Sequence, residues 1–366
     1  MATSSRSNLF IVALLVWMTR IHPCSARAKP KFPAIIIFGD SSVDPGNNYI
    51  NTFFKANVAP YGTNFPGHVP TGRFSDGKLV TDFMASTLGI KDVVSPFLAP
   101  NLSDDDLRTG VSFASAGSGY DDLTTTLINV IPVSRQAEMF RSYIDKLKRI
   151  VGDEETKSTI AEALVLISAG TNDLIYNFFD IPTRRLEFNF DGYTGFLLQR
   201  LEDLVEEIYD LGCRKIIVVG LPPIGCLPLQ MTFRLENPRN RHCLEDQNSY
   251  ARSYNKKLVR LLPEIQAKLP TSKLVYADAY QPLMNMINHP EQYGIAETRV
   301  GCCGSGSGSG SGILLGLSIF CNGMSPVCGN PWEYVFWDSV HPTQQVYRQL
   351  AKYVVKEVVP KLTYAL

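Results

Sequence analysis

The sequence predicts an α/β protein in which a parallel β-sheet is covered by helices on both faces. Short apolar runs without polar alternation recur along the chain, as is typical of strands buried on both faces. Stretches with apolar residues at helical spacing separate these runs, which favours a doubly wound sheet. The predicted strands are 34–38, 111–115, 163–168, 216–219 and 274–277, and the predicted helices are 79–88, 134–151, 196–209, 244–269 and a last one from about Pro342 to the C-terminus.

Composition and charge narrow the class of function. With 366 residues, 45% of them hydrophobic and 19% charged, the chain is long and apolar enough to bury a large core. Basic and acidic residues balance at 35 each, so the net charge offers no electrostatic case for nucleic-acid binding, which requires a basic surface. We expect a single domain over residues 29–366 and no nucleic-acid partner.

The first residues have the pattern of a secretory signal peptide. A basic residue precedes the apolar run 9–18, and small residues follow at Ala26 and Ala28, where cleavage is expected. The apolar run is too short to be a membrane anchor, because a bilayer core of about 30 Å needs roughly 20 residues, and no later segment is long enough. We therefore expect residues 1–28 to be removed and the remainder to be secreted and extracellular. In that compartment Asn101, which begins an Asn-Leu-Ser sequon, is a glycosylation candidate.

Export also changes how the eight cysteines are interpreted. Cys24 leaves with the signal peptide, and in an oxidising compartment the others favour disulfides over metal binding. The adjacent Cys302 and Cys303 lack the spacing of a zinc knuckle, so we predict no metal site. An odd number of cysteines remains, and Cys213, beside an apolar run, is our candidate for the free thiol. The residues alone do not choose a pairing among Cys226, Cys243, Cys302, Cys303, Cys321 and Cys328.

The stretch after the first predicted strand contains a candidate catalytic serine. Residues 34–38 are all apolar, and small and polar residues begin abruptly at Gly39, so the strand is expected to end in a turn. Ser41 then lies at the carboxyl end of a strand, the edge of an α/β sheet at which ligands bind. An ordinary Asp/Gly/Asn turn is the alternative, unless other parts of the chain supply partners for Ser41.

Two further strands end in groups that can donate hydrogen bonds. The run 111–115 continues into Ala-Gly-Ser-Gly, where the backbone N–H of Gly117 can approach a ligand closely. The run 163–168 is followed by a Gly-Thr-Asn-Asp turn, which places the carboxamide of Asn172 at the same edge. Together with the N–H of Ser41, these donors predict an oxyanion hole, in which the loss of one donor costs about 2.7–4 kcal/mol.

His341 stands out among the five histidines, because the others lie in the signal peptide or in segments typical of surface loops. It follows Asp338 by three residues, and a carboxylate on one ring nitrogen would leave the other free to take a proton from a serine. A structural or capping pair is the alternative. A rival nucleophile is Ser115, since residues 113–117 approach the G-x-S-x-G elbow of the α/β-hydrolases, but the first position of that motif is wrong.

These blocks, in this order, resemble the plant GDSL esterase/lipases of the SGNH hydrolase superfamily. The resemblance extends from Phe38 to Pro342. It also includes the Gly-Leu-Pro-Pro-Ile-Gly-Cys segment at 220–226 and the Cys-Cys-Gly segment at 302–304. The matching blocks are Phe38-Gly39-Asp40-Ser41 with Asp44 and Gly46-Asn47-Asn48, Ser112 to Gly117, Gly170-Thr171-Asn172-Asp173, and Asp338 to Pro342.

The resemblance implies a flavodoxin-like three-layer α/β/α sandwich and a serine esterase that needs no cofactor. By its pattern Ser41 is the nucleophile, His341 the base and Asp338 the group that orients it, while Gly117 and Asn172 are oxyanion donors. It also favours a disulfide between Cys226 and Cys243.

Three departures from the family pattern are visible. Ser42 replaces the leucine of the family name, Ser112 stands where asparagine is usual, and the Gly/Ser tract at 304–312 is longer and simpler than the family's loop.

The predicted function is a secreted esterase or lipase that hydrolyses small or polymer-linked carboxylic esters through an acyl-enzyme on Ser41. Two alternatives remain open at this point. One is an acyltransferase that uses the same residues on an alcohol acceptor, and the other is an exported binding protein that keeps the fold without turnover. Sequence does not rank lipid chains against the acetyl groups of a polysaccharide as substrates.

Overall fold

The computed structural model describes residues 31–49, 54–126, 128–234, 241–304 and 321–363. The predicted signal peptide and residues 305–312 of the Gly/Ser tract lie outside these ranges. The central sheet has six strands in the order β2-β3-β1-β4-β5-β6, and every pairing is parallel. The strands are β1 Ile35–Gly39, β2 Ser95–Pro96, β3 Val111–Ser112, β4 Leu164–Ser168, β5 Lys215–Val219 and β6 Lys273–Ala277.

The prediction of an α/β fold with a parallel sheet is confirmed. Without the two-residue β2, the order across the sheet is β3-β1-β4-β5-β6. Numbered along the chain, this is 2-1-3-4-5, the strand order of flavodoxin-like folds. In this order the chain leaves β1 for β3 on one side and then continues at β4 on the other. Ser41 follows β1 and therefore lies at the point of topological reversal, where such sheets bind ligands.

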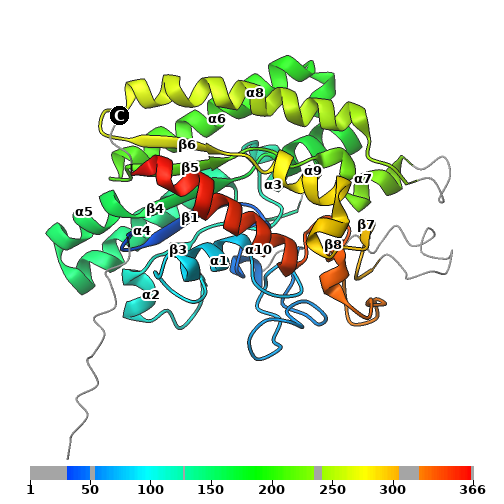
Figure 1. Ribbon diagram of the computed structural model, residues 1–366. Coiled ribbons are helices and arrows are strands. Elements are labelled where there is room, and N and C mark those ends of the chain that lie inside the picture. Colours follow the sequence, from blue (N-terminus) through cyan, green and yellow to red (C-terminus); the bar gives the residue numbers. More distant parts are fainter. Residues whose placement is uncertain (1–30, 50–53, 127, 235–240, 305–320, 364–366) are drawn as a thin grey trace, which may run out of the picture.

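Helices cover both faces of the sheet, so the protein has three layers (Figure 1). On β1, Ile36 and Phe38 belong to one apolar cluster, and Ile35 and Ile37 belong to another, because successive strand residues point to opposite faces. The first cluster is completed by α4 Val133–Val151, α6 Phe190–Asp210 and α8 Glu245–Lys268. The second is completed by α1 Val80–Thr87, by α10 Gln344–Tyr353 and by the turns that follow α10.

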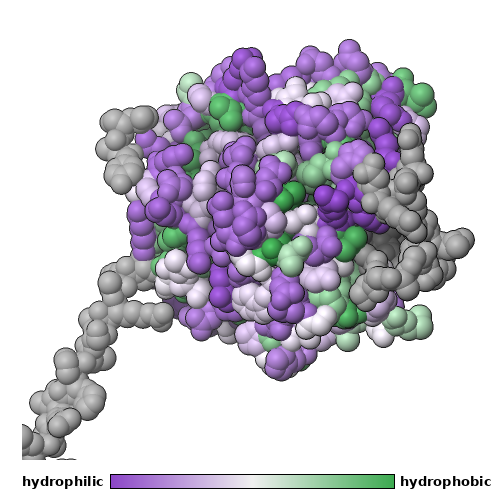
Figure 2. All heavy atoms as spheres, turned by 45° about the vertical axis from the view of Figure 1, so that its right-hand side comes forward, coloured by the Kyte–Doolittle hydropathy of each residue, from purple (hydrophilic) through white to green (hydrophobic). Residues whose placement is uncertain are grey.

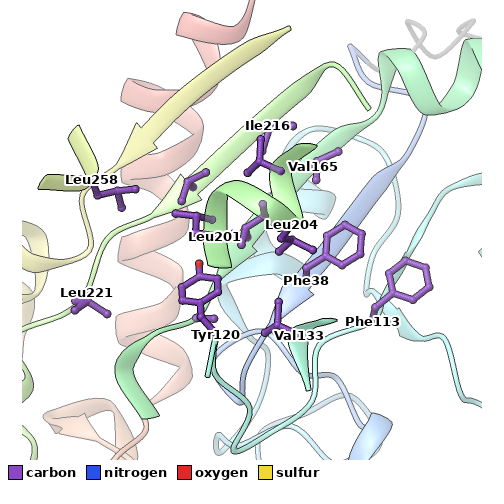
Figure 3. Close-up of a cluster of buried hydrophobic side chains, with 14 of the residues drawn as sticks. Phe38, Phe113, Tyr120, Val133, Val165, Leu201, Leu204, Ile216, Leu221 and Leu258 are labelled. Atoms are coloured by element: carbon purple, nitrogen blue, oxygen red, sulfur yellow. The ribbon is translucent and has the colours of Figure 1, made fainter. Parts of the chain in front are cut away.

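The larger core lies between the sheet and α4, α6 and α8. Figure 3 shows Phe38 and Phe113 side by side at one end of this cluster and Leu201, Leu204 and Leu258 packed over the strands. The rings of Phe38 and Phe113 are stacked with centroids 5.3 Å apart. This core packs against one face of β1 and thereby fixes where the turn that carries Ser41 begins.

The remaining elements surround the carboxyl edge or the periphery of the sheet. A second sheet pairs β7 Glu297–Gly301 with β8 Tyr334–Phe336. Disulfides join Cys302 to Cys328 and Cys303 to Cys321 beside it, and a third joins Cys226 to Cys243, the pair that the resemblance implies. Cys213 is a buried free thiol. The other helices are α2 Asp104–Arg108, α3 Asp122–Thr126, α5 Asp153–Glu162, α7 Pro228–Phe233 and α9 Tyr280–Asn288.

Two elements differ from their predicted bounds for physical reasons. The strand predicted at 111–115 is shorter, since the carbonyls of Ser112 and Ala114 accept hydrogen bonds from the side chain of Asn47. The last helix was predicted from about Pro342, but α10 begins at Gln344, because residues before it are held against β8. Phe336 forms a bridge with Pro342, and the N–H of Trp337 donates to the carbonyl of His341.

The face of the molecule in Figure 2 is largely hydrophilic, with hydrophobic residues in small separate spots. Within the described ranges, no helix is both long and apolar enough to cross a membrane.

Candidate active site

The turn after β1 is fixed by its backbone before any catalytic group is considered. Gly39 has a φ of +144°, and a Cβ there would lie 2.0 Å from the carbonyl oxygen of Ser168, so only glycine fits between β1 and β4. The buried side chain of Gln136 on α4 accepts a hydrogen bond from the N–H of Gly39 and donates one to its carbonyl, both at 2.8 Å. The end of β1 is thus anchored to the helix layer beneath it.

The carboxylates of the turn act on its backbone. Asp40 accepts hydrogen bonds from the N–H and the hydroxyl of Ser42. Asp44 accepts from the N–H groups of Gly46 and Asn47 and from that of Ala116, a residue of the neighbouring strand end. Burial raises the pKa of Asp44 to about 6, although these hydrogen bonds and Arg73 oppose the shift. Asp44 therefore joins the nucleophile turn to the segment that leads to Gly117.

The two serines about which the sequence left questions have structural contacts. Ser112 donates to the carbonyl of Val43 at 3.0 Å, so it links the second block to the nucleophile turn. Ser115 donates to the side chain of Asn48 and accepts from the N–H of Ile131, and it is fully buried. The hydroxyl of the rival nucleophile is therefore engaged in two structural hydrogen bonds.

The predicted nucleophile, base and orienting carboxylate are close together. Nε2 of His341 lies 2.7 Å from Oγ of Ser41, and Nδ1 lies 2.8 and 2.9 Å from the two carboxylate oxygens of Asp338. Asp338 also accepts from the N–H groups of Val340 and His341. All three side chains are buried, and Ser41 is the most exposed of them at 8%. This geometry is that of a serine, a histidine and an aspartate arranged for proton transfer.

Two aromatic residues support this group. The hydroxyl of Tyr61 donates to Asp338 at 2.8 Å and accepts from the N–H of Cys321 at 3.2 Å. Burial and the nearby Asp338 raise the pKa of Tyr61 well above its usual value, so the phenol keeps its proton and remains a donor. The ring of Phe74 packs against the imidazole of His341 with centroids 4.7 Å apart. These contacts hold the imidazole and its carboxylate in one orientation.

The oxyanion donors predicted from sequence line one small hollow with Ser41. Gly117 has a φ of +85°, and a Cβ there would lie 2.7 Å from Ile128, which explains why the position is glycine. The carboxamide of Asn172 donates one N–H to the carbonyl of Ser118 at 2.9 Å, which orients the amide and leaves its second N–H for a ligand. Phe54, Phe74 and Tyr176 form the apolar part of the wall.

Asp173 ties together the two loops that carry these donors. Its carboxylate accepts hydrogen bonds from the N–H groups of Tyr120 and Asp121 and from the hydroxyl of Thr124. It lies so close to Gly119 that a Cβ there would be 2.1 Å from it. Burial raises the pKa of Asp173 to about 7. The residue next to Asn172 thus fixes the loop that follows Gly117.

A second and larger hollow also reaches Ser41. It has a volume of about 130 Å³ and extends from the nucleophile between the sheet and α10. Ser41, Asn172 and His341 line both hollows, so these three residues lie where the two hollows meet.

The described residues contain no group of three or more His, Cys, Asp or Glu that could hold a metal ion. The glycosylation candidate Asn101 is exposed, and Ser103 of its sequon caps α2 through the N–H of Asp106.

Comparison with known proteins assigns the chain. A model of the GDSL-like lipase/acylhydrolase family matches residues 35–354. The chain belongs to this family. It is 50% identical over 354 residues to one GDSL esterase/lipase of Arabidopsis thaliana, covering 96% of each chain, and 49% identical over 328 residues to a second, covering 89% of each. The resemblance seen in the sequence is therefore confirmed, and it places this chain among the GDSL hydrolases.

Several contacts that build the site of this GDSL family member were not predicted from sequence. Gln136 and Tyr61 make their contacts over 97 and 277 residues of chain, and no local pattern marks them. Asp173 belongs to the Gly-Thr-Asn-Asp block, and its adjacency to Asn172 was the signal that could have identified it. Ser42, in place of the usual leucine, donates to Asp40 and approaches Ser168 at 3.1 Å.

Proposed function

We propose that this GDSL family member is a secreted serine esterase that hydrolyses carboxylic esters through an acyl-enzyme on Ser41. The observation that carries the proposal is the 2.7 Å approach of His341 Nε2 to Ser41 Oγ, with Asp338 on the opposite ring nitrogen. The N–H groups of Ser41 and Gly117 and the amide of Asn172 are the proposed donors to the oxyanion.

The reaction follows from these positions. Ser41 Oγ attacks the ester carbonyl while its proton passes to His341 Nε2, and the carbonyl oxygen becomes an oxyanion held by the three donors. The C–O bond to the alcohol then breaks, and His341 returns the proton to the departing alkoxide. Water attacks the acyl-enzyme, gives a proton to His341 and releases the carboxylic acid as Ser41 is protonated again. Asp338 keeps the imidazole in the tautomer that these transfers require.

The test is the loss of esterase activity in Ser41→Ala, with Ser249→Ala on the exposed surface of α8 as the matched serine control. We expect kcat for a nitrophenyl ester to fall by about 10³-fold or more in the first variant and to be unchanged in the second, because the oxyanion donors alone retain only residual catalysis. Full activity in Ser41→Ala would refute the proposal. A fluorophosphonate probe should label wild-type Ser41, and an exported binding protein without turnover would not be labelled.

Hydrolysis is distinguished from acyl transfer by its product. With an acceptor alcohol present, an esterase releases mainly free acid, whereas an acyltransferase forms mainly a new ester.

Export is supported by the three disulfides among the described residues and by the pattern of residues 1–28. Mass spectrometry of the protein recovered outside the cell should find an N-terminus near residues 27–29. Asn101→Gln should abolish any glycan at that site.

A further inference from the structure

The hollow of about 130 Å³ beside Ser41 is a gap between two layers of the fold. In Figure 1, α10 crosses over the strands at this place. Protein interiors contain few voids larger than a water molecule, so a gap of this size beside Ser41 indicates a site for part of a ligand. The floor is apolar and comes from β4, β5 and β6, with Leu166, Val219 and Ala277, while the roof comes from α10 and the turn after it, with Leu350 and Val354.

Two residues lie between this gap and a second hollow. Tyr353 and Asp278 line both this gap and a second hollow of about 330 Å³ between α9 and α10. Burial and the nearby charge of Asp278 raise the pKa of the Tyr353 phenol, so the two side chains lie close together. The carboxylate of Asp278 in turn accepts from the N–H groups of Tyr280 and Gln281 at the start of α9. Tyr353 therefore lies between the two hollows.

We propose that this gap is the acyl-binding pocket and that Tyr353 limits the acyl chain to about six carbons, since a cavity of about 150 Å³ holds one six-carbon benzene ring. The proposal rests on the esterase function proposed above. The acyl group stays attached to Ser41 in both half-reactions, whereas the alcohol must leave and water must enter. The larger apolar pocket suits the group that stays, and the smaller hollow beside Gly117 and Asn172 remains for exchange.

Two variants test the pocket in opposite directions. Leu350→Trp fills it from the roof, and Tyr353→Ala removes the side chain that lies between it and the second hollow. Lys352→Trp adds the same bulk on the exposed side of α10 and is the control. The measured quantity is kcat/KM for nitrophenyl acetate, hexanoate and dodecanoate, with acetate as the internal reference for correctly folded enzyme.

In the wild type, we expect kcat/KM to rise by up to about fourfold for each methylene from acetate to hexanoate, because each is buried in an apolar site, and to fall for dodecanoate. Leu350→Trp should lower the hexanoate-to-acetate ratio by about tenfold or more. Tyr353→Ala should raise the dodecanoate-to-hexanoate ratio by about tenfold. Lys352→Trp should leave both ratios within about twofold of the wild type.

Fluorophosphonate labelling distinguishes a failure of the acyl-pocket proposal from a failure of the esterase proposal. If Ser41 is not labelled and no ester is cleaved, the proposed function itself is wrong. If Ser41 is labelled and the esters are cleaved, but neither Leu350→Trp nor Tyr353→Ala changes its ratio, the acyl pocket is overturned and the esterase function stands. Changes in both ratios, with the control unchanged, establish the pocket.

Discussion

Ser41 lies between two regions of opposite character. On one side, the turn 40–48 is a dense polar network in which Asp44 alone accepts hydrogen bonds from three backbone N–H groups. On the other side, the gap beneath α10 is apolar and incompletely filled, and the buried hydroxyl of Tyr347, which lines it, has no partner among the described residues. Ser41 is held by hydrogen-bonded backbone on one side and faces a hollow on the other.

The difference separates two requirements of a serine hydrolase. The position of the nucleophile tolerates little error, so the polar side satisfies its buried groups and accepts the desolvation of several carboxylates. Substrate must enter on the other side, so the side chains there are packed less densely and leave a cavity. Changes in the polar region should therefore cost stability or turnover, whereas changes in the apolar region should act mainly on substrate choice.

The largest effect is expected from the ion pair that supports the polar region. Arg73 binds both carboxylate oxygens of Asp82 at 2.8 Å and also donates to the carbonyl of Pro45, within the turn 40–48. Both side chains are almost fully buried. Arg73→Met should lower the free energy of unfolding by about 3–5 kcal/mol, because it leaves Asp82 buried without its cation. Urea denaturation measures this.

The matched control is Arg141→Met, which breaks the ion pair with Glu207 at a site where the arginine side chain is half exposed. It should change the unfolding midpoint very little, since exposed pairs contribute little. Equal losses in the two variants would contradict the importance given to the polar region.

Asn172 stands at the boundary of the two regions, and its loss should act on turnover. Asn172→Ala removes one proposed oxyanion donor and should lower kcat by about 10²–10³-fold, or about 2.7–4 kcal/mol. Because the donor acts on charge that develops in the transition state, KM should change much less. Steady-state kinetics with one nitrophenyl ester gives both values. A change confined to KM would show that Asn172 binds substrate rather than the oxyanion.

The sequence predicted the parts of the site that depend on local pattern and on a general rule of sheet topology. The apolar runs identified the strands, and the rule that the carboxyl ends of parallel strands meet at one edge brought Ser41, Gly117 and Asn172 together before their distances were known. The three-residue spacing of Asp338 and His341 likewise indicated their contact. The hydrogen bonds now place these groups around one serine.

What the sequence did not predict depends on contacts between distant segments. The side chain of Gln136 binds Gly39, and Tyr61 binds Asp338, but neither residue lies in a motif. The start of α10 was placed two residues early, because the pairing of Phe336 with Pro342 is a tertiary contact. The acyl pocket is also a product of tertiary packing, since its walls come from strands, helices and turns that are far apart in the sequence.

A smaller effect than the loss of Asn172 is expected from pH, through the carboxyl group of Asp44. Burial raises its folded-state pKa from 3.8 to about 6. Between these values the folded protein retains a proton that the unfolded chain has released, so the contribution of Asp44 to stability falls as pH rises, by about 3 kcal/mol at most. The stability advantage of wild type over Asp44→Asn should therefore be larger at pH 4 than at pH 6.5. Urea unfolding of both proteins at the two pH values isolates this group, and an advantage that grows with pH would show that Asp44 is ionised in the fold.

The smallest and most direct comparison uses one tyrosine from each region. Tyr61 and Tyr347 are both almost fully buried. Among the residues that the structure describes, the Tyr61 hydroxyl has two partners, Asp338 and the N–H of Cys321, and the Tyr347 hydroxyl has none. Tyr61→Phe should lower the free energy of unfolding by about 1–3 kcal/mol, because it leaves a buried N–H without an acceptor. Tyr347→Phe removes a buried hydroxyl that has no protein partner and should be neutral or slightly stabilising. Chemical denaturation of the two variants decides the matter. If Tyr347→Phe costs as much as Tyr61→Phe, the apolar side of Ser41 contains a bound polar partner, and the contrast between the two regions is weaker than their contacts indicate.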